Sequence, residues 1–363
     1  MGKPVRVLVV DDSAVIRELL STLLSSDPEI EVVGTASDPI IARDRIKELN
    51  PDVITLDVEM PNMDGVTFLR KIMALRPMPV IMISTLTKAG AEITLEALEI
   101  GAVDFIAKPT TDVANSMAAV AAELQAKVKI AAQTRVGVRR IVLAARPPRR
   151  ERPARSQERI IVIGASTGGV EALKEVLINM SAECPPILIT QHMPPRFTAT
   201  FAERLNRECP MTVSEAKDSE VIEPNHVYIA PGSHHLELVR VAGHFRCRLS
   251  DGPTVSGHRP SVDVLFQSAA RIAGRITVAA ILTGMGKDGA EGMLELRNAG
   301  AITLGQDEAS SLIYGMPRAA FERGAVMRQY SLTHMADAII NACDSDTPAK
   351  ASTAHHNYAA GAS

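Results

Sequence analysis

The sequence of 363 residues has no tryptophan, few other aromatic residues and only four cysteines. The cysteines show no C-x-x-C pair and no regular spacing, which favours free thiols in a reducing cytoplasm over a disulfide framework or zinc site. No apolar run approaches the ~18 residues of a membrane-spanning helix, and the N-terminus lacks the apolar core of a signal peptide. We therefore expect a cytoplasmic protein without membrane insertion. The cysteines are Cys184, Cys209, Cys247 and Cys343.

The formal net charge of −3 conceals one strongly basic segment. Residues 135–159 contain nine arginines against Glu151 and Glu158, a local excess of seven positive charges. Prolines among like charges cannot build a core, so residues 131–158 are expected to form a linker. The linker could touch nucleic acid or an acidic partner, but no aromatics are interleaved for base stacking, which favours a solvated hinge without nucleic acid. The Ala/Ser/Thr-rich residues 345–363 are expected to form a disordered tail.

The first 130 residues alternate short apolar runs with helical patterns, which is typical of βαβ units and a parallel sheet. In such sheets, functional side chains gather at the carboxyl ends of the strands. We expect a five-stranded, flavodoxin-like domain over residues 1–130. Its strands are predicted at Val5–Val10, Glu31–Ala36, Val53–Leu56, Val80–Ile83 and Asp104–Ala107.

The ends of these strands carry three carboxylates, a hydroxyl and a lysine, which are Asp11, Asp12, Asp57, Ser84 and Lys108. Clustered carboxylates repel one another and favour an oxygen-liganded cation such as Mg²⁺. An aspartate beside that ion can attack a phosphoryl group and form an acyl phosphate. The lysine supplies compensating charge, and the hydroxyl can hydrogen-bond the added oxygens.

This half of the chain resembles the receiver domain of bacterial response regulators. The matching strings are Val9-Val10-Asp11-Asp12-Ser13, residues 57–65, Ser84 and Lys108-Pro109. The resemblance implies that Asp57 is the phosphorylated residue. It implies a Mg²⁺ site made by Asp11, Asp12, Asp57 and the Glu59 carbonyl, and a phosphate switch made by Ser84, Phe105 and Lys108. Phe105 stands where many receivers carry tyrosine, so a phenolic hydrogen bond is not expected.

The second half opens on a strand at Ile160–Ile163 and a helical pattern over residues 170–177. Between them, residues 164–168 match G-x-S-x-G, a strand-to-helix elbow that exposes the hydroxyl of Ser166. The alternative is a glycine loop that binds an anion at the helix N-terminus. The short motif leaves both interpretations open.

Residues 159–344 are expected to form a Rossmann-like, doubly wound α/β domain with a small antiparallel hairpin. The hairpin is predicted at Leu236–Val241 and His244–Leu249, with its turn at Ala242-Gly243. Further strands are predicted at Pro186–Thr190, His226–Ala230, Ile276–Leu282 and Ala301–Leu304.

Three strands of this domain end near Ser166, His192 and Asp288, residue types that suit a nucleophile, a general base and an orienting carboxylate. The order Ser, His, Asp differs from that of α/β-hydrolases. A dinucleotide site is disfavoured, because the position of its ribose-binding acid is taken by His192 and no G-x-x-x-x-G-K is present. The competing histidines are His234, His235 and His258, and the competing acids are Asp251, Asp263 and Asp307.

Five ordered strings make this half similar to the catalytic domain of the chemotaxis protein-glutamate methylesterase family (CheB). They are residues 164–169, 191–193, 230–232, 258–263 and 283–290. The resemblance implies a serine esterase that demethylates glutamate methyl esters, and deamidates glutamines, on the cytoplasmic helices of methyl-accepting chemoreceptors. Ser166 would be the nucleophile, His192 the base and Asp288 its orienter, with no esterase cofactor.

The oxyanion donors are less defined: the backbone N-H near Thr167 is the first candidate and that near Met285 the second. A chemotaxis histidine kinase would be the phosphodonor, and the chain is expected to be a monomer. Two other functions compete, a DNA-binding regulator and a receiver-gated nucleotide-binding module. The large α/β second half disfavours the first, which would need a compact helix-turn-helix or winged output.

Overall fold

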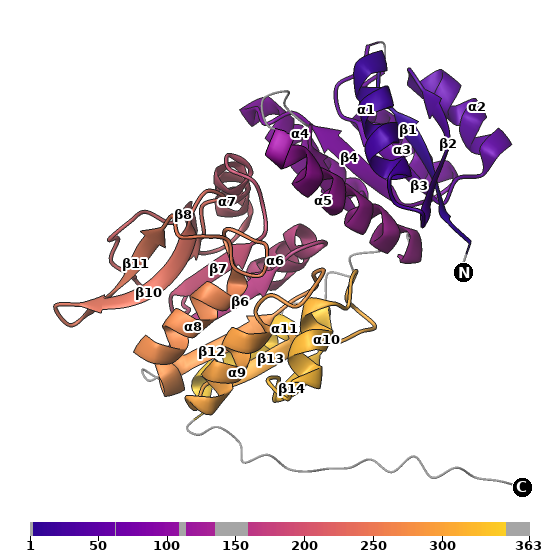
Figure 1. Cartoon of the computed structure of the whole chain (residues 1–363). Helices are drawn as coiled ribbons and strands as arrows, with labels where there is room; N and C mark the ends of the chain where they lie inside the picture. The colour runs from indigo at the N-terminus through magenta and orange to yellow at the C-terminus, as the bar shows by residue number, and fades with distance from the viewer. Residues whose placement is uncertain (1–2, 62, 109–113, 135–158, 346–363) are drawn as a thin grey trace, which may run out of the picture.

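The computed structural model describes residues 3–61, 63–108, 114–134 and 159–345. Pro109, most of the expected linker (135–158) and nearly all of the expected tail (346–363) lie outside the described residues. The chain forms two α/β domains, each with its own parallel sheet (Figure 1). Among the described residues, no helix is both long and apolar enough to cross a bilayer.

The N-terminal domain is a five-stranded parallel sheet in the order β2-β1-β3-β4-β5, as predicted. Alternate residues of β1 enter opposite cores: Val7 and Val9 pack toward α1 and α5, and Leu8 and Val10 toward the other helices. The strands are β1 (Val5–Val10), β2 (Ile30–Ala36), β3 (Val53–Asp57), β4 (Val80–Ser84) and β5 (Asp104–Ala107). The helices are α1 (Ala14–Ser25), α2 (Pro39–Leu49), α3 (Gly65–Leu75), α4 (Lys88–Ile100) and α5 (Ala114–Gln133).

Side chains at the helix starts fix where these helices begin. Ser13, Asp38, Asp64 and Thr87 each accept a hydrogen bond from a backbone N-H in the first turn of α1, α2, α3 and α4. Because each helix follows a strand directly, these caps lie at the same edge of the sheet as the strand ends. Helix α5 continues to Gln133, beyond residue 130 where the first domain was expected to end.

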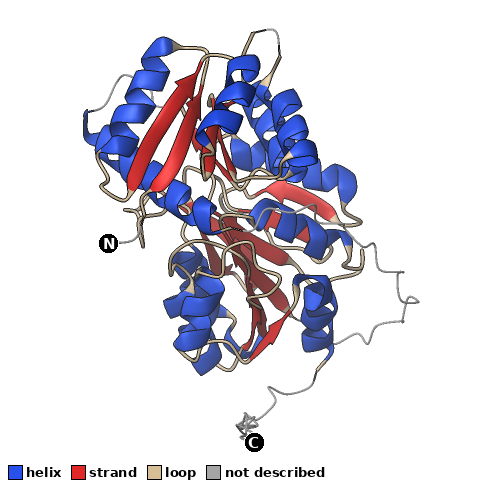
Figure 2. Cartoon of the chain, turned by 90° about the vertical axis from the view of Figure 1, so that its right-hand side faces the viewer, coloured by secondary structure: helices blue, strands red, loops and turns tan. Residues whose placement is uncertain are grey.

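The C-terminal domain is a seven-stranded sheet in the order β14-β13-β12-β6-β7-β9-β8, and every pair in it is parallel. Helices cover both faces (Figure 2). The strands are β6 (Ile160–Ala165), β7 (Ile187–Gln191), β8 (Thr212–Glu215), β9 (His226–Ile229), β12 (Thr277–Ile281), β13 (Ile302–Gln306) and β14 (Arg328–Tyr330). The helices are α6 (Gly169–Ile178), α7 (Phe197–Glu208), α8 (Val262–Ile272), α9 (Ala290–Asn298), α10 (Met316–Glu322) and α11 (Leu332–Asp344), with a 3₁₀ turn at Gly274–Ile276.

The predicted hairpin is present as β10 (His235–Val241) and β11 (His244–Ser250). Its turn residues Ala242 and Gly243 both have positive φ, which is the geometry of the tight hairpin turns expected there. Strands β8 and β14 were not predicted. Both lie at the edges of the sheet and are only partly buried, so neither carries the apolar run that marked the other strands.

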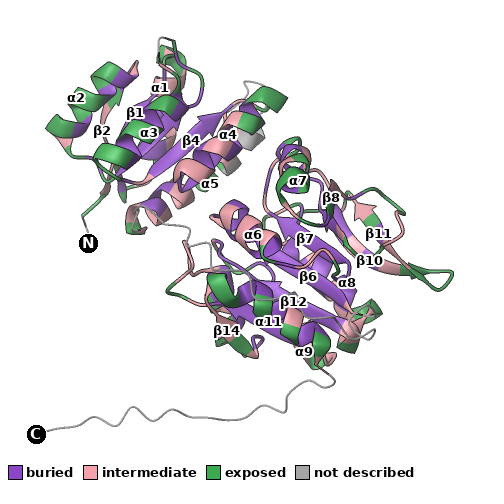
Figure 3. Ribbon diagram, turned by 180° about the vertical axis from the view of Figure 1, so that it is seen from behind, coloured by how far each residue is buried: buried purple, intermediate pink, exposed green. Residues whose placement is uncertain are grey.

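The two domains pack against each other through α4 and β5 of the first and α6 and α7 of the second (Figure 1). Phe105 of β5 stacks on Phe197 of α7, with ring centroids 4.5 Å apart. Buried apolar residues form one cluster that continues from the N-terminal into the C-terminal domain. Figure 3 shows this burial along both sheets. The amino-terminal domain therefore covers one end of the second sheet, where the candidate site lies.

Candidate active site

The elbow after β6 holds Ser166 between the strand and the start of α6. Gly168 has a φ of 76°, and a Cβ there would lie 2.8 Å from the side chain of Leu312, so glycine is required. A Cβ on Gly169 would lie 2.1 Å from Oε1 of Gln191. Gln191 in turn donates from Nε2 to the Ser166 carbonyl at 2.9 Å. The glycines and this buried amide therefore fix the backbone that presents the Ser166 hydroxyl.

His192 follows β7 and lies between Ser166 and Asp288. Its Nδ1 is 3.1 Å from Ser166 Oγ, and its Nε2 is 2.7 Å from Asp288 Oδ2. With Asp288 ionised, Nε2 carries the hydrogen and Nδ1 is left free to accept the serine proton. The three strand-end residues selected from the sequence are thus hydrogen-bonded in series, a geometry that suits nucleophilic catalysis.

Asp288 is buried and is held by the N-terminus of α8. It accepts hydrogen bonds from the Val262 N-H at 2.7 Å, the Asp263 N-H at 3.0 Å and the Ser261 hydroxyl at 2.8 Å. Burial alone would raise its pKa, but the hydrogen bond and charge of His192 and these backbone donors hold the pKa of Asp288 below its ordinary value. Asp288 is therefore a carboxylate throughout the working pH range.

Asp288, and none of the competing acids, is the hydrogen-bond partner of His192 Nε2. Asp263 starts α8 and donates its N-H to Asp288, while its own carboxylate accepts from the Gly292 N-H at 2.8 Å. Asp307 accepts from the N-H and hydroxyl of Ser310. Asp251 is exposed, and its backbone carbonyl accepts from Arg259 at 2.9 Å.

The competing histidines differ in position. His234 pairs with the neighbouring Ser233 hydroxyl at 2.7 Å. His235 is buried and accepts the Ser261 N-H at 3.2 Å, so it lies behind Asp288. His258 stacks directly on His192, with centroids 3.8 Å apart.

Both candidate oxyanion segments adjoin the nucleophile. Thr167 follows Ser166 directly at the start of α6, where free N-H groups and the helix dipole favour negative charge. On the other side, a Cβ on Gly284 would lie 2.8 Å from Ser166 Cβ, so the strand end that leads to Met285 passes close to the serine. Because both segments lie close to Ser166, backbone N-H groups of either one can stabilise an oxyanion formed there.

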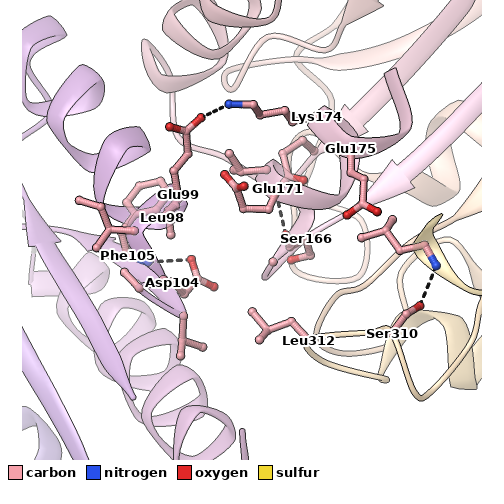
Figure 4. A pocket seen from close by; sticks show the side chains of 18 of the residues that line it. Leu98, Glu99, Asp104, Phe105, Ser166, Glu171, Lys174, Glu175, Ser310 and Leu312 are labelled. Atoms are coloured by element: carbon pink, nitrogen blue, oxygen red, sulfur yellow. Dashed lines mark hydrogen bonds and ion pairs between the residues drawn. The ribbon is translucent and has the colours of Figure 1, made fainter. Parts of the chain in front are cut away.

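A cavity of about 870 Å³ lies between the two domains and contains Ser166 and His192 in its wall. Figure 4 shows Leu98, Glu99, Asp104 and Phe105 of the N-terminal domain facing Ser166 across it. Thr167 donates its hydroxyl to Asp104, so the neighbour of the nucleophile is bound directly to the other domain. The N-terminal domain therefore forms part of the wall of the cavity that contains the candidate nucleophile.

A cluster of charges joins the domains at the edge of this cavity. Glu99 of α4 pairs with both Lys174 of α6 and Arg204 of α7, and Lys174 also pairs with Glu208 at 2.6 Å. Glu171 is a third carboxylate in this space, and its Oε1 is buried without a hydrogen-bond partner. Burial, followed by the charge of Glu99, raises the pKa of Glu171 to about 7.

The strand ends of the N-terminal domain form an acidic pocket. Carboxylate oxygens of Asp11, Asp12 and Asp57 lie within 4.8 Å of one another. Lys108 Nζ is 2.8 Å from Asp57 Oδ2 and 3.3 Å from Asp11 Oδ2, and the latter oxygen accepts no hydrogen bond. Burial raises the pKa of Asp57 to about 6, and the charge of Asp11 adds to the shift. An oxygen-only set with mutual repulsion and an unsatisfied oxygen fits a hard divalent cation.

The residues expected to respond to phosphate are placed as follows. Ser84 is buried, and its Oγ accepts a hydrogen bond from Thr94 of α4 at 2.7 Å. Phe105 lies in the domain interface rather than against solvent. The Glu59 side chain accepts from Thr85 at 3.3 Å, and its N-H donates to Asp57.

Sequence reasoning did not assign roles to several residues near the triad. They are Gln191, His235, His258 and Ser261, together with Asp104 at the domain interface; Thr167 was named for its backbone N-H but not for its hydroxyl. The strings 191–193 and 258–263 contain three of them, Gln191, His258 and Ser261, so the family resemblance marked these positions without indicating what they do. The pairing of Asp104 with Thr167 left no sequence signal, because it joins separate domains.

Comparison with known proteins supports the assignment of both halves. The CheB methylesterase family model matches residues 161–339, and the response regulator receiver domain model matches residues 7–120. The protein-glutamate methylesterase/protein-glutamine glutaminase 1 of Caulobacter vibrioides is 57% identical over 338 residues, covering 93% of this chain and 97% of the relative. The protein-glutamate methylesterase/protein-glutamine glutaminase 2 of Pseudomonas aeruginosa is 54% identical over 337 residues, covering 93% of this chain and 96% of the relative.

The second half is also similar to a solved structure of a CheB catalytic domain. The CheB methylesterase catalytic domain of Thermotoga maritima is 36% identical, with a TM-score of 0.50, and the match covers 50% of this chain and 97% of that one.

Proposed function

The chain belongs to the CheB methylesterase family, and we propose that it demethylates glutamate methyl esters, and deamidates glutamines, on chemoreceptor helices under control of receiver phosphorylation. The proposed receiver runs from residue 1 to the end of α5 at Gln133 and the proposed esterase domain over residues 159–344, with the linker between them and residues 345–363 as the tail. The observation that supports the chemistry best is the series Ser166, His192, Asp288 at one sheet edge.

The reaction follows from that geometry. His192 accepts the Ser166 proton at Nδ1, and the serine oxygen attacks the ester carbonyl carbon of the substrate side chain. The collapsing intermediate expels methanol, which takes the proton back from His192, and leaves an acyl-enzyme. A water molecule activated by His192 then releases the glutamate carboxylate and restores Ser166. Glutamine follows the same steps with ammonia as the leaving group.

Asp288 and the backbone donors stabilise the charges that develop during the reaction. Asp288 keeps the Nε2 hydrogen on His192 and stabilises the imidazolium that forms during attack. N-H groups near Thr167 or Met285 stabilise the developing oxyanion. Thr167 is engaged with Asp104 in the packed state, so separation of the domains also frees the segment that bears the first candidate donor.

The receiver takes a phosphoryl group on Asp57. Asp11, Asp12 and Asp57 would hold Mg²⁺, with the Glu59 carbonyl as a further oxygen. The ion would offset carboxylate repulsion and the charge of the phosphoryl oxygens. Lys108 already contacts Asp57 and can follow the added charge. A chemotaxis histidine kinase is the proposed phosphodonor.

Phosphorylation opens the esterase by weakening the packed arrangement. Ser84 is linked through Thr94 to α4, and α4 carries Glu99, which pairs with the esterase domain. When Ser84 turns toward the phosphoryl oxygens, this link changes, and Phe105 can leave its stack on Phe197. A tenfold activation requires only ~1.4 kcal/mol of differential packing energy, within the usual range of coupling between sites.

The direct test is methanol release from methylated chemoreceptor membranes. Full-length chain with Mg²⁺ and a small phosphodonor should release methanol faster than the chain without phosphodonor. The Asp57→Asn variant should keep the slow rate and ignore the phosphodonor, while Glu99→Gln should raise the rate without phosphodonor. Absence of methanol release from the phosphorylated chain would refute the proposed function.

A further inference from the structure

His258 contacts the catalytic base face to face, and the mechanism above gives it no task. The rings of His192 and His258 are nearly parallel, with an interplanar angle of 11° and centroids 3.8 Å apart. His258 comes from the loop before α8, far from His192 in the sequence. It is not among the side chains that line the cavity between the domains, whereas His192 is.

The loop that carries His258 is fixed at both ends. Val255 and His258 exchange backbone hydrogen bonds of 3.0 Å and 2.9 Å across a turn in which Ser256 and Gly257 have positive φ. On the other side, Ser261 donates its hydroxyl to Asp288 at 2.8 Å. One short segment therefore both anchors the triad carboxylate and presents a ring to the triad histidine.

The hydrogen bonds of His192 leave one motion unrestrained. Contacts of Nδ1 with Ser166 and of Nε2 with Asp288 fix two points in the plane of the imidazole. The ring can still tilt about the line that joins those two nitrogens, and a tilt misdirects the lone pair at Nδ1. A parallel ring against one face opposes that tilt and excludes water from the face.

The charge state of His258 suits this position. Burial, followed by the charge of His192, lowers the pKa of His258 to about 4, so its ring is neutral at working pH. The groups that face it electrostatically are His192, Asp288, Glu123 and Lys127. A neutral aromatic face does not repel the imidazolium that His192 becomes during attack, and its electron density favours that cation.

We propose that His258 is a positioning residue that holds the plane of the His192 ring through stacking. The proposal rests on the proposed function, because it assigns His192 as the base. What matters is a flat aromatic ring at this position, not its nitrogens. Phenylalanine should therefore replace histidine there, and alanine should not.

The test compares His258→Ala and His258→Phe in the full chain with saturating phosphodonor. His258→Ala should lower kcat for methanol release by about tenfold while KM changes less than about twofold, the size expected for loss of one aromatic contact. His258→Phe should restore kcat to within about threefold of the parent. The matched control is His226→Ala, which removes a ring stacked on Tyr228 at 4.2 Å outside the triad. This control should affect thermal stability and leave kcat unchanged.

A second readout separates this proposal from the proposed function. Covalent labelling of Ser166 by a fluorophosphonate needs the base but no receptor substrate, so its rate should fall in His258→Ala and recover in His258→Phe even if methanol release is absent. Thermal midpoints of both variants identify any loss of folding. The proposal is overturned if alanine keeps full kcat and labelling rate, if phenylalanine fails as badly as alanine while folded, or if KM alone changes.

Discussion

Replacing Glu171 with glutamine should remove a pH dependence from the packing of the two domains. In the packed state Glu171 shares a small space with Glu99 and Glu208, against the cations Lys174 and Arg204, and one of its oxygens has no partner. Three carboxylates face two cations there, so a proton on Glu171 relieves the excess negative charge. When the receiver leaves, Glu99 leaves with it and Glu171 faces water.

The size of the effect follows from the pKa of Glu171, raised from an ordinary 4.5 to about 7 in the packed state. The part of this penalty that comes from Glu99 exists only when the domains are packed, because Glu99 belongs to the receiver. Packing is therefore strongest below pH 4.5 and weakens as the pH rises through about 7. If the whole shift of roughly 2.5 units depended on packing, it would correspond to ~3.4 kcal/mol, of which about 1.4 kcal/mol, or tenfold, falls between pH 6 and pH 8.

The assay is the ratio of methanol release without phosphodonor to that with phosphodonor, measured from pH 6 to pH 8. Taking the ratio cancels titration of the catalytic groups themselves. The parent chain should show a ratio that rises about tenfold across this interval. Glu171→Gln should show a low, flat ratio, because a neutral side chain packs equally well at every pH.

The control for this experiment is Glu291→Gln, which neutralises an exposed acid of α9 that pairs with Arg323 at 2.9 Å. It should behave as the parent chain does. A flat ratio in the parent, or a rise that persists in Glu171→Gln, would refute the assignment of Glu171 as the group whose protonation is coupled to packing.

Three further outcomes are expected. Ser166→Ala should abolish methanol release while the thermal midpoint stays near that of the parent, since its hydroxyl forms the acyl-enzyme; activity near the parent level would exclude this nucleophile. Asp288→Asn should cost up to about 10⁴ in kcat because His192 takes the wrong tautomer, whereas Asp307→Asn should cost little; the reverse order would identify the wrong acid. Asp12→Ala should prevent phosphorylation by a small donor and leave the basal methanol release unchanged; normal uptake in the presence of a chelator would contradict the metal site.

Strand ends explain why much of both sites was predictable. The apolar runs located β1, β3, β4 and β5, and parallel strands bring their carboxyl ends to one edge, so Asp57 and Lys108 were expected to meet and lie 2.8 Å apart. The same reasoning brought Ser166, His192 and Asp288 together. Strands β8 and β14 were not predicted, because strands at the edge of a sheet are only partly buried and need not carry an apolar run.

The contacts that depend on tertiary packing could not be predicted in this way. The sequence offered Asp263 as a competing acid and did not indicate that the first N-H groups of its helix hold Asp288. Nothing local to Glu99 indicates Lys174 or Arg204 as its partners, because the pairing exists only when two separately formed surfaces meet. The stack of His258 on His192 likewise depends on a turn whose position is set by the whole sheet.

The most direct test of the account is to identify the residue acylated by a fluorophosphonate in the full chain, and to time its labelling with and without phosphodonor. The account predicts modification of Ser166, slow in the unphosphorylated chain and faster after phosphorylation of Asp57, because the packed receiver walls the cavity that contains Ser166 and binds the hydroxyl of the adjacent Thr167. Labelling at another residue would contradict the catalytic assignment. Equal rates of Ser166 labelling in the two states would contradict control by the receiver.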